Sequence, residues 1–93
     1  MPRAKRPPAD DLGDGARVVS TELLGRLVRQ RRKKSGVTLA QAAGLSDVGV
    51  RFLHELEHGK RTASLGKVLQ VLDRLGLEVW VVPRGAPPPG GRR

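Results

Sequence analysis

Cysteine is absent from the 93-residue sequence, and phenylalanine and tryptophan occur once each. Without cysteine the chain can form neither disulfide bonds nor thiolate metal sites, which fits a reducing compartment. No apolar run approaches the roughly 20 residues of a membrane-spanning helix, and the basic segments lack the bulky aromatics of an interfacial helix. The opening residues, MPRAKRPPADD, contain no apolar stretch of a secretory signal. We therefore expect a cytoplasmic protein that does not bind membranes.

Residues that support catalysis are also scarce. The sequence has two histidines, no glycine-rich phosphate loop and no paired carboxylates in a domain large enough to enclose a pocket. Glu55 and Glu57 lie on adjacent faces of a predicted helix, where a surface role and an ion pair explain them better. The sequence thus predicts no enzyme, no cofactor and no metal site.

Positive charge is plentiful. Eighteen lysines and arginines stand against nine acidic residues, a formal net charge of +9. A surplus of this size suits a polyanionic partner, and nucleic acid is the leading candidate. Plain solubility is the alternative explanation of the same charge.

Both ends of the chain differ in composition from its middle. Residues 1–19 contain three prolines and mixed charge, which predicts a flexible basic arm. Its Arg3, Lys5 and Arg6 can contact DNA phosphates, although a solvated tail is the favoured explanation of these charges. Residues 83–93 are rich in proline, glycine and arginine and are predicted to be a disordered tail. The folded domain is therefore expected at residues 20–82, small enough that dimerisation would add useful stability.

Hydrophobic spacing and capping residues predict four helices, at about 20–34, 38–45, 49–58 and 64–75. Gly36, Gly59 and Gly76 follow three of them as stop signals. Apolar residues recur at helical spacing in the first, third and fourth helices, as Leu24, Leu27 and Val28, then Phe52, Leu53 and Leu56, then Leu65, Val68, Leu69, Leu72 and Leu75.

A single β-strand is predicted at residues 77–82, where Leu77, Val79, Trp80 and Val81 precede Pro83. A strand needs backbone partners, and the sequence offers no second strand. We expect the same strand of a second copy to pair with it, antiparallel across a two-fold axis. An unpaired extended tail is the alternative.

Two short helices joined by a tight turn, between two longer helices, form the helix-turn-helix arrangement. From Leu24 to Leu75 the sequence resembles the XRE (Cro/C1-type) repressor family, through LGRLVRQRRKKSGVT, LAQAAGLSDVGVRFLHELEHGK and TASLGKVLQVLDRLG. The resemblance implies an all-α, lambda repressor-like domain of four to five helices whose third helix enters the major groove. The 29 residues RFLHELEHGKRTASLGKVLQVLDRLGLEV also resemble the HipB-like antitoxin branch.

The resemblance assigns base contacts to the start of the third helix. Gly49, Val50 and Arg51 open this helix, and His54 and Glu55 follow one turn later. Arg51 can bind guanine O6 and N7 together, and Val50 can contact a thymine methyl. His54 can face the groove or, equally well, solvent.

The resemblance also assigns residues that contact phosphates and one structural ion pair. Arg32 is expected to pair with Glu57, which would tie the first helix to the third. The phosphate-binding candidates are Thr38, Gln41, Lys60, Arg61, Thr62 and Ser64.

Four positions depart from the family pattern. Leu39 stands where many members have a phosphate-binding glutamine, and Asp47 replaces the usual turn glycine, although aspartate tolerates the left-handed conformation. Gly44 is expected to weaken the second helix. Arg31 occupies a usually apolar position, where only its stem can pack.

The sequence therefore predicts a transcriptional repressor that binds a palindromic operator in double-stranded DNA as a homodimer. The HipB-like resemblance implies a further role, as the antitoxin of a toxin–antitoxin pair that binds a HipA-like kinase toxin and represses their shared operon. A stand-alone regulator without a toxin partner is the alternative, and a protein-interaction module without DNA binding is a third.

Overall fold

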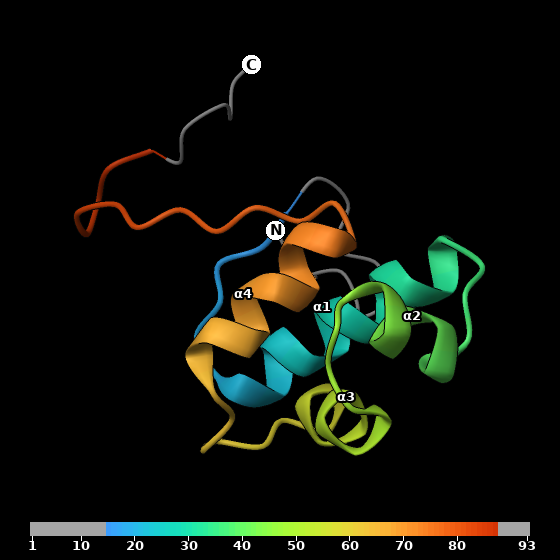
Figure 1. The fold of residues 1–93 in the computed structure, drawn as a ribbon. Helices are drawn as coiled ribbons and strands as arrows, with labels where there is room; N and C mark the ends of the chain where they lie inside the picture. Colours follow the sequence, from blue (N-terminus) through green and yellow to red (C-terminus); the bar gives the residue numbers. More distant parts are fainter. Residues whose placement is uncertain (1–14, 88–93) are drawn as a thin grey trace.

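The computed structural model describes residues 15–87, which contain four α-helices and no β-strand. The helices are α1 (Thr21–Lys34), α2 (Leu39–Leu45), α3 (Val50–Glu57) and α4 (Leu65–Arg74). Figure 1 shows α1 in the middle of the molecule, with α3 below it and α2 to its right. The prediction of an all-α domain with four helices is confirmed. None of the helices between residues 15 and 87 has the length and apolar character needed to cross a membrane.

Polar side chains at the predicted positions define where helices begin. The Ser20 hydroxyl oxygen accepts a hydrogen bond from the Leu23 N–H at 3.0 Å and starts α1. Thr38 and Gln41 form a reciprocal capping box at the start of α2, because each side chain accepts a hydrogen bond from the other's backbone N–H. The turn after α2 places Asp47 at a φ of 57°, the left-handed conformation that aspartate was expected to tolerate.

The core lies where all four helices meet, and only some of the regularly spaced apolar residues of α4 belong to it. Leu65 and Leu69 are 70% and 45% exposed, whereas Val71 is fully buried. Leu65 and Leu69 share the helical spacing of the core residues but lie outside the core, and the buried stripe of α4 includes Val71 instead. The buried apolar residues are Val28, Ala42, Ala43, Leu53, Leu56, Val68, Val71, Leu72 and Leu75.

Helix α1 crosses the C-terminal end of α3 at very short range. A Cβ atom placed on Gly25 would lie 2.5 Å from the Leu56 carbonyl oxygen and 2.7 Å from that of Glu57. Both neighbours are backbone atoms, so neither can swing aside. The absent side chain of Gly25 therefore sets the distance between the two helices.

Arg31 makes a contact that its expected role did not include. Its Nε–H donates to the Leu75 carbonyl oxygen at 2.7 Å, which satisfies an acceptor at the end of α4. The prediction that only the stem of Arg31 would pack was incomplete, because the guanidinium joins α1 to α4.

The segment at residues 77–82 is extended and is not part of a sheet in this single chain. The Leu77 N–H donates to the Leu72 carbonyl at 2.8 Å, and residues 78–82 make no further backbone hydrogen bond within the described chain. Pairing with a second copy stays a prediction. Arg3, Lys5 and Arg6 of the predicted arm, and residues 88–93 of the predicted tail, lie outside the described residues.

We predict that Gly25→Ala lowers the free energy of unfolding by about 1–3 kcal/mol, because the added methyl group forces α1 away from α3. Chemical denaturation followed by circular dichroism measures the change.

Gly44→Ala is the matched control, because Gly44 lies inside α2 and nothing would lie within 4 Å of its added Cβ. This change should stabilise the protein by up to about 1 kcal/mol through helix propensity. Equal effects of the two substitutions would contradict the close crossing.

Candidate nucleic-acid interface

The turn between α2 and α3 is fixed from behind by α4. Gln70 of α4 donates from its Nε2 to the Ser46 carbonyl oxygen at 3.0 Å, and Ser46 itself is almost fully buried. Ala42 and Ala43 on the inner side of α2 are also buried, which permits close approach of the neighbouring helices. The orientation of α3 relative to α2 is therefore determined by packing on its inner side.

The N-terminal end of α3 is open to solvent. Gly49 precedes the helix without a side-chain cap, and space is free around its Cα. Val50 is half exposed, and the Arg51 side chain is 91% exposed. On the opposite side of the same helix, Leu53 and Leu56 are buried. Helix α3 thus combines an anchored face with an outer face that carries an extended guanidinium.

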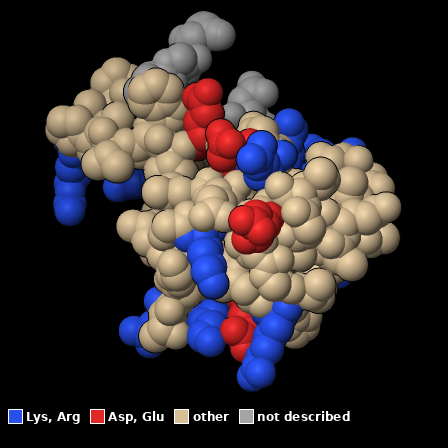
Figure 2. Space-filling model, in the orientation of Figure 1, with Lys and Arg blue, Asp and Glu red and all other residues tan. Residues whose placement is uncertain are grey.

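Glu55 connects the outer face of α3 to the following loop. Its carboxylate lies 2.9 Å from Lys60 Nζ and 3.3 Å from Arg51 Nε. The hydrogen bond from Lys60 lowers the pKa of Glu55, and Arg51 adds to this effect. Figure 2 shows basic side chains with an acidic one among them along the lower edge of the molecule, where α3 and this loop lie.

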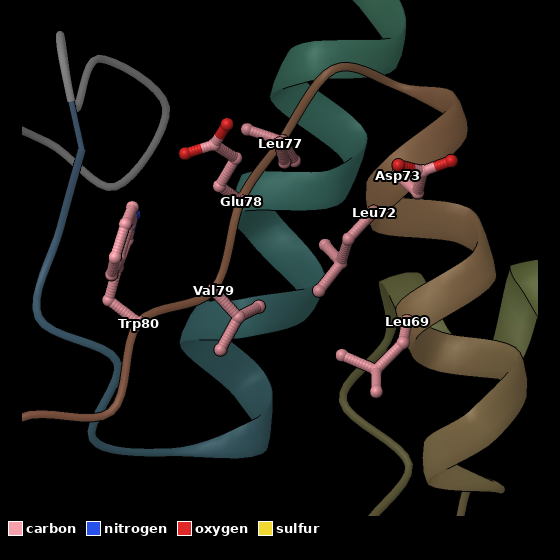
Figure 3. Close-up of a pocket in the computed structure, with 7 residues that line it drawn as sticks. All are labelled: Leu69, Leu72, Asp73, Leu77, Glu78, Val79 and Trp80. Carbon is pink, nitrogen blue, oxygen red and sulfur yellow. The ribbon is translucent and has the colours of Figure 1, made fainter.

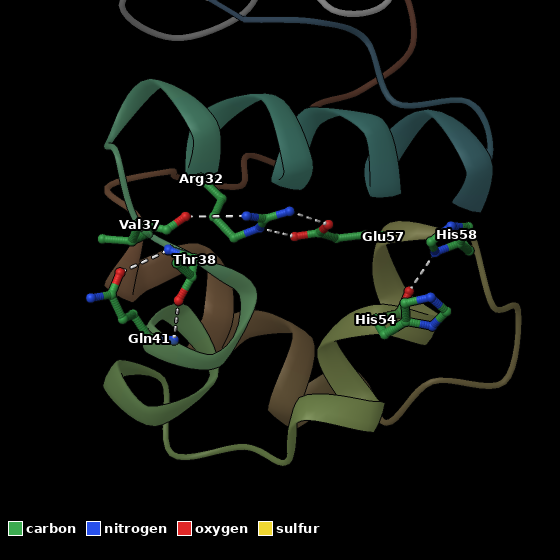
Figure 4. Close-up of polar contacts among 7 residues, drawn as sticks. All are labelled: Arg32, Val37, Thr38, Gln41, His54, Glu57 and His58. Atoms are coloured by element: carbon green, nitrogen blue, oxygen red, sulfur yellow. Dashed lines mark hydrogen bonds and ion pairs between the residues drawn. The ribbon is translucent and has the colours of Figure 1, made fainter.

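His54 and His58 lie next to each other at the C-terminal end of α3 (Figure 4). Their ring centroids are 4.3 Å apart, and both residues are exposed. His58 Nδ1 is 2.8 Å from the His54 carbonyl oxygen. In the same view, Thr38 and Gln41 are at the other end of the molecule, so the sequence-derived candidates do not form a single cluster.

The remaining phosphate-binding candidates are exposed, and some also have structural roles. Thr38 and Gln41 cap α2, and the Ser64 hydroxyl oxygen accepts from the Lys67 N–H at the start of α4. Lys60, Arg61 and Thr62 lie in the exposed loop between α3 and α4. Leu39, by contrast, packs against the core, so it presents no polar group in place of the family glutamine.

Arg32 and Glu57 form an ion pair between α1 and α3. Arg32 Nε is 2.6 Å from one carboxylate oxygen of Glu57, and Arg32 Nη2 is 3.0 Å from the other. A further Nη1 hydrogen bond reaches the Val37 carbonyl oxygen at 3.1 Å, as Figure 4 shows. The hydrogen bond to Glu57 raises the pKa of Arg32. The Glu57 side chain is almost completely buried, so removal of Arg32 would leave an unpaired charge between α1 and α3.

Three contacts behind this surface were not anticipated from sequence: Gly25 against α3, Arg31 on Leu75, and Gln70 on Ser46. A glycine inside a helix was a usable signal for the first. The other two depend on tertiary placement, which no local pattern specifies. Within residues 15–87 no group of three or more potential metal-ligating side chains is present.

Comparison with known proteins agrees with this geometry. Residues 23–80 match the model of a family described as a helix-turn-helix domain. The chain is also 45% identical over 62 residues to y4mF of Sinorhizobium fredii (strain NBRC 101917 / NGR234), an uncharacterized HTH-type transcriptional regulator; the match covers 67% of this chain and 82% of that protein. The chain belongs to the helix-turn-helix family of transcriptional regulators.

Proposed function

We propose that this chain is a sequence-specific DNA-binding transcriptional repressor that inserts the N-terminal end of α3 into the major groove. The observation that carries the proposal is Arg51, whose side chain extends into solvent from a helix that is anchored on its opposite face. Such a guanidinium can donate two hydrogen bonds to one guanine edge. Val50 beside it offers an apolar contact to a thymine methyl.

Glu55 gives this surface a means of discrimination. In free protein its carboxylate partly neutralises Arg51 and Lys60. DNA of the wrong sequence offers only its phosphates to Arg51 and Lys60, and these phosphates must compete with the Glu55 carboxylate. A correctly placed guanine replaces the weaker contact to Arg51 with two hydrogen bonds, so Glu55 penalises incorrect sequences more than the correct one.

Backbone contacts would position α3 in the groove without specifying sequence. The loop after α3 supplies Lys60, Arg61 and Thr62, and the N-terminal ends of α2 and α4 are marked by Thr38 and Ser64. Gln41 uses its Oε1 atom in the capping box, while its Nε2 has no hydrogen-bond partner within the described chain and can donate to a phosphate.

We further propose that the repressor is a homodimer joined through residues 77–82. Trp80 and Val81 are 60% and 94% exposed as residues, and Figure 3 shows Val79 facing a shallow groove with Leu69 of α4 on its other side. The backbone of residues 78–82 has free donors and acceptors in the described chain. Strand pairing with a second copy would satisfy these groups and cover the apolar side chains.

A two-fold axis through that ribbon gives the operator its symmetry. Two copies of α3 would then contact half-sites about one helical turn, or about 34–36 Å, apart. The operator is therefore expected to be palindromic.

We predict that Arg51→Ala reduces affinity for the selected operator by about 1–3 kcal/mol and relaxes the preference for guanine at one position in each half-site. Selection of bound sequences from a random DNA pool, followed by fluorescence anisotropy on the selected site, measures both effects.

Lys60→Ala is the comparison variant, because Lys60 lies in the adjacent loop and is assigned to phosphate. It should weaken binding to all sequences alike and lower the salt slope by about one. Unchanged affinity and sequence preference in Arg51→Ala would refute the groove assignment.

We predict that Val79→Pro converts the dimer to monomer, because proline removes the N–H that the ribbon needs and cannot occupy a paired central position. Sedimentation velocity at micromolar concentration measures the change. Val79→Thr, which keeps both the β-branch and the N–H, is the control and should remain dimeric. A wild-type monomer under these conditions would rule out the ribbon.

The resemblance of residues 51–79 to the HipB-like branch supports a narrower proposal, in which the repressor is also an antitoxin. We predict that it co-purifies with a HipA-like kinase encoded in the same operon and suppresses that kinase's toxicity on co-expression. If no such gene adjoins this one, or the two proteins do not associate, the stand-alone regulator is the better description.

A further inference from the structure

We propose that His54 and His58 form a binding site for one transition-metal ion such as Zn²⁺ or Cu²⁺ on the surface of α3. The two residues are one helical turn apart, so both side chains project from the same side of the helix. They are the only histidines of the chain, and there is no cysteine. This proposal departs from the expectation, drawn from the sequence, that the chain has no metal site.

The hydrogen bond from His58 Nδ1 to the His54 carbonyl leaves the other ring nitrogen, Nε2, available to bind a metal ion. A carbonyl oxygen can only accept, so the contact of 2.8 Å to the His54 carbonyl places the ring proton of neutral His58 on Nδ1. The lone pair is then on Nε2, at the outer edge of the ring. Metal-binding histidines commonly have this arrangement, in which the second ring nitrogen donates to a backbone carbonyl.

The separation of the two rings fits a shared ion. Zn–N bonds of about 2.0–2.1 Å at a tetrahedral angle hold two nitrogens about 3.3 Å apart. The ring centroids are 4.3 Å apart and the planes differ by 33°, so the rings are already neighbours. Shared binding requires a rotation of His54 that places one of its ring nitrogens at that spacing from His58 Nε2. The His54 ring makes no hydrogen bond to residues 15–87 that would oppose this rotation.

The position on the helix also favours a cation. His58 is the C-cap of α3, where the carbonyl groups of the last turn point outward and the helix dipole attracts positive charge. Glu55 is already engaged by Lys60 and Arg51, so the two imidazoles are the ligands from this chain, and water completes the coordination shell. Imidazole ligands select Zn²⁺, Ni²⁺ and Cu²⁺ over Mg²⁺, which prefers oxygen.

Calorimetric titration of ZnCl₂ into the full chain, made without a histidine tag, tests the site in the absence of DNA. We expect saturable uptake of one Zn²⁺ per chain, accompanied by a rise in Tm, and no such response to MgCl₂. His54→Gln should lose the uptake while leaving the C-cap of α3 intact. Equal Zn²⁺ affinity in wild type and His54→Gln would overturn the proposal.

A second pair of measurements distinguishes chelation from the mere presence of two histidines. The double variant His58→Gln with Arg61→His keeps two imidazoles but not their spacing, and it should bind no more Zn²⁺ than His58→Gln alone. Electron paramagnetic resonance of the wild-type chain with one equivalent of CuCl₂ should show coupling to two imidazole nitrogens. Coupling to a single nitrogen, or full binding by the respaced variant, would contradict the chelate.

Discussion

The fold depends on the crossing of α1 over the C-terminal end of α3. Gly25 brings the two backbones close, and the Arg32–Glu57 pair joins the same two helices with two hydrogen bonds of 2.6 and 3.0 Å. These contacts are coupled, because the guanidinium can reach the buried carboxylate only while the helices remain at this distance. Loss of either partner would leave a charge inside the protein, at a cost of about 3–5 kcal/mol.

This crossing explains how α3 can be both fixed and accessible. Its C-terminal half is held by α1 through Glu57, and the turn before it is held by α4 through Gln70 and Ser46. Arg51 takes no part in either attachment, and its only partner in the described chain is the partly buried carboxylate of Glu55. A ligand can therefore replace that partner without any cost to the fold. Rigid placement of α3, with a guanidinium that the fold does not require, suits recognition of a fixed DNA edge.

The helices and their caps could be predicted from sequence because each depends on neighbours within about four residues. Thr38 and Gln41 are an example, since the capping box is complete within one turn. Contacts between distant segments could not be predicted in this way. Arg31 was assigned by its position in α1, but its partner is the carbonyl of Leu75, 44 residues away. The candidate residues of the interface could likewise be chosen from sequence. The ion pairs that Glu55 forms with both Arg51 and Lys60 could be found only in the folded structure.

Leu69 is an apolar residue of α4 that the core does not cover. Its periodicity is as regular as that of the buried residues, yet it lies beside Val79 at a groove that the single chain leaves open. An apolar residue that α4 exposes to solvent gains free energy when another surface covers it. Residues 15–87 contain nine buried apolar residues, which is a small core, and each additional covered side chain matters at that size. If a second copy covers Leu69, Val79 and Trp80, folding and association become one equilibrium, and the stability of the protein rises with its own concentration.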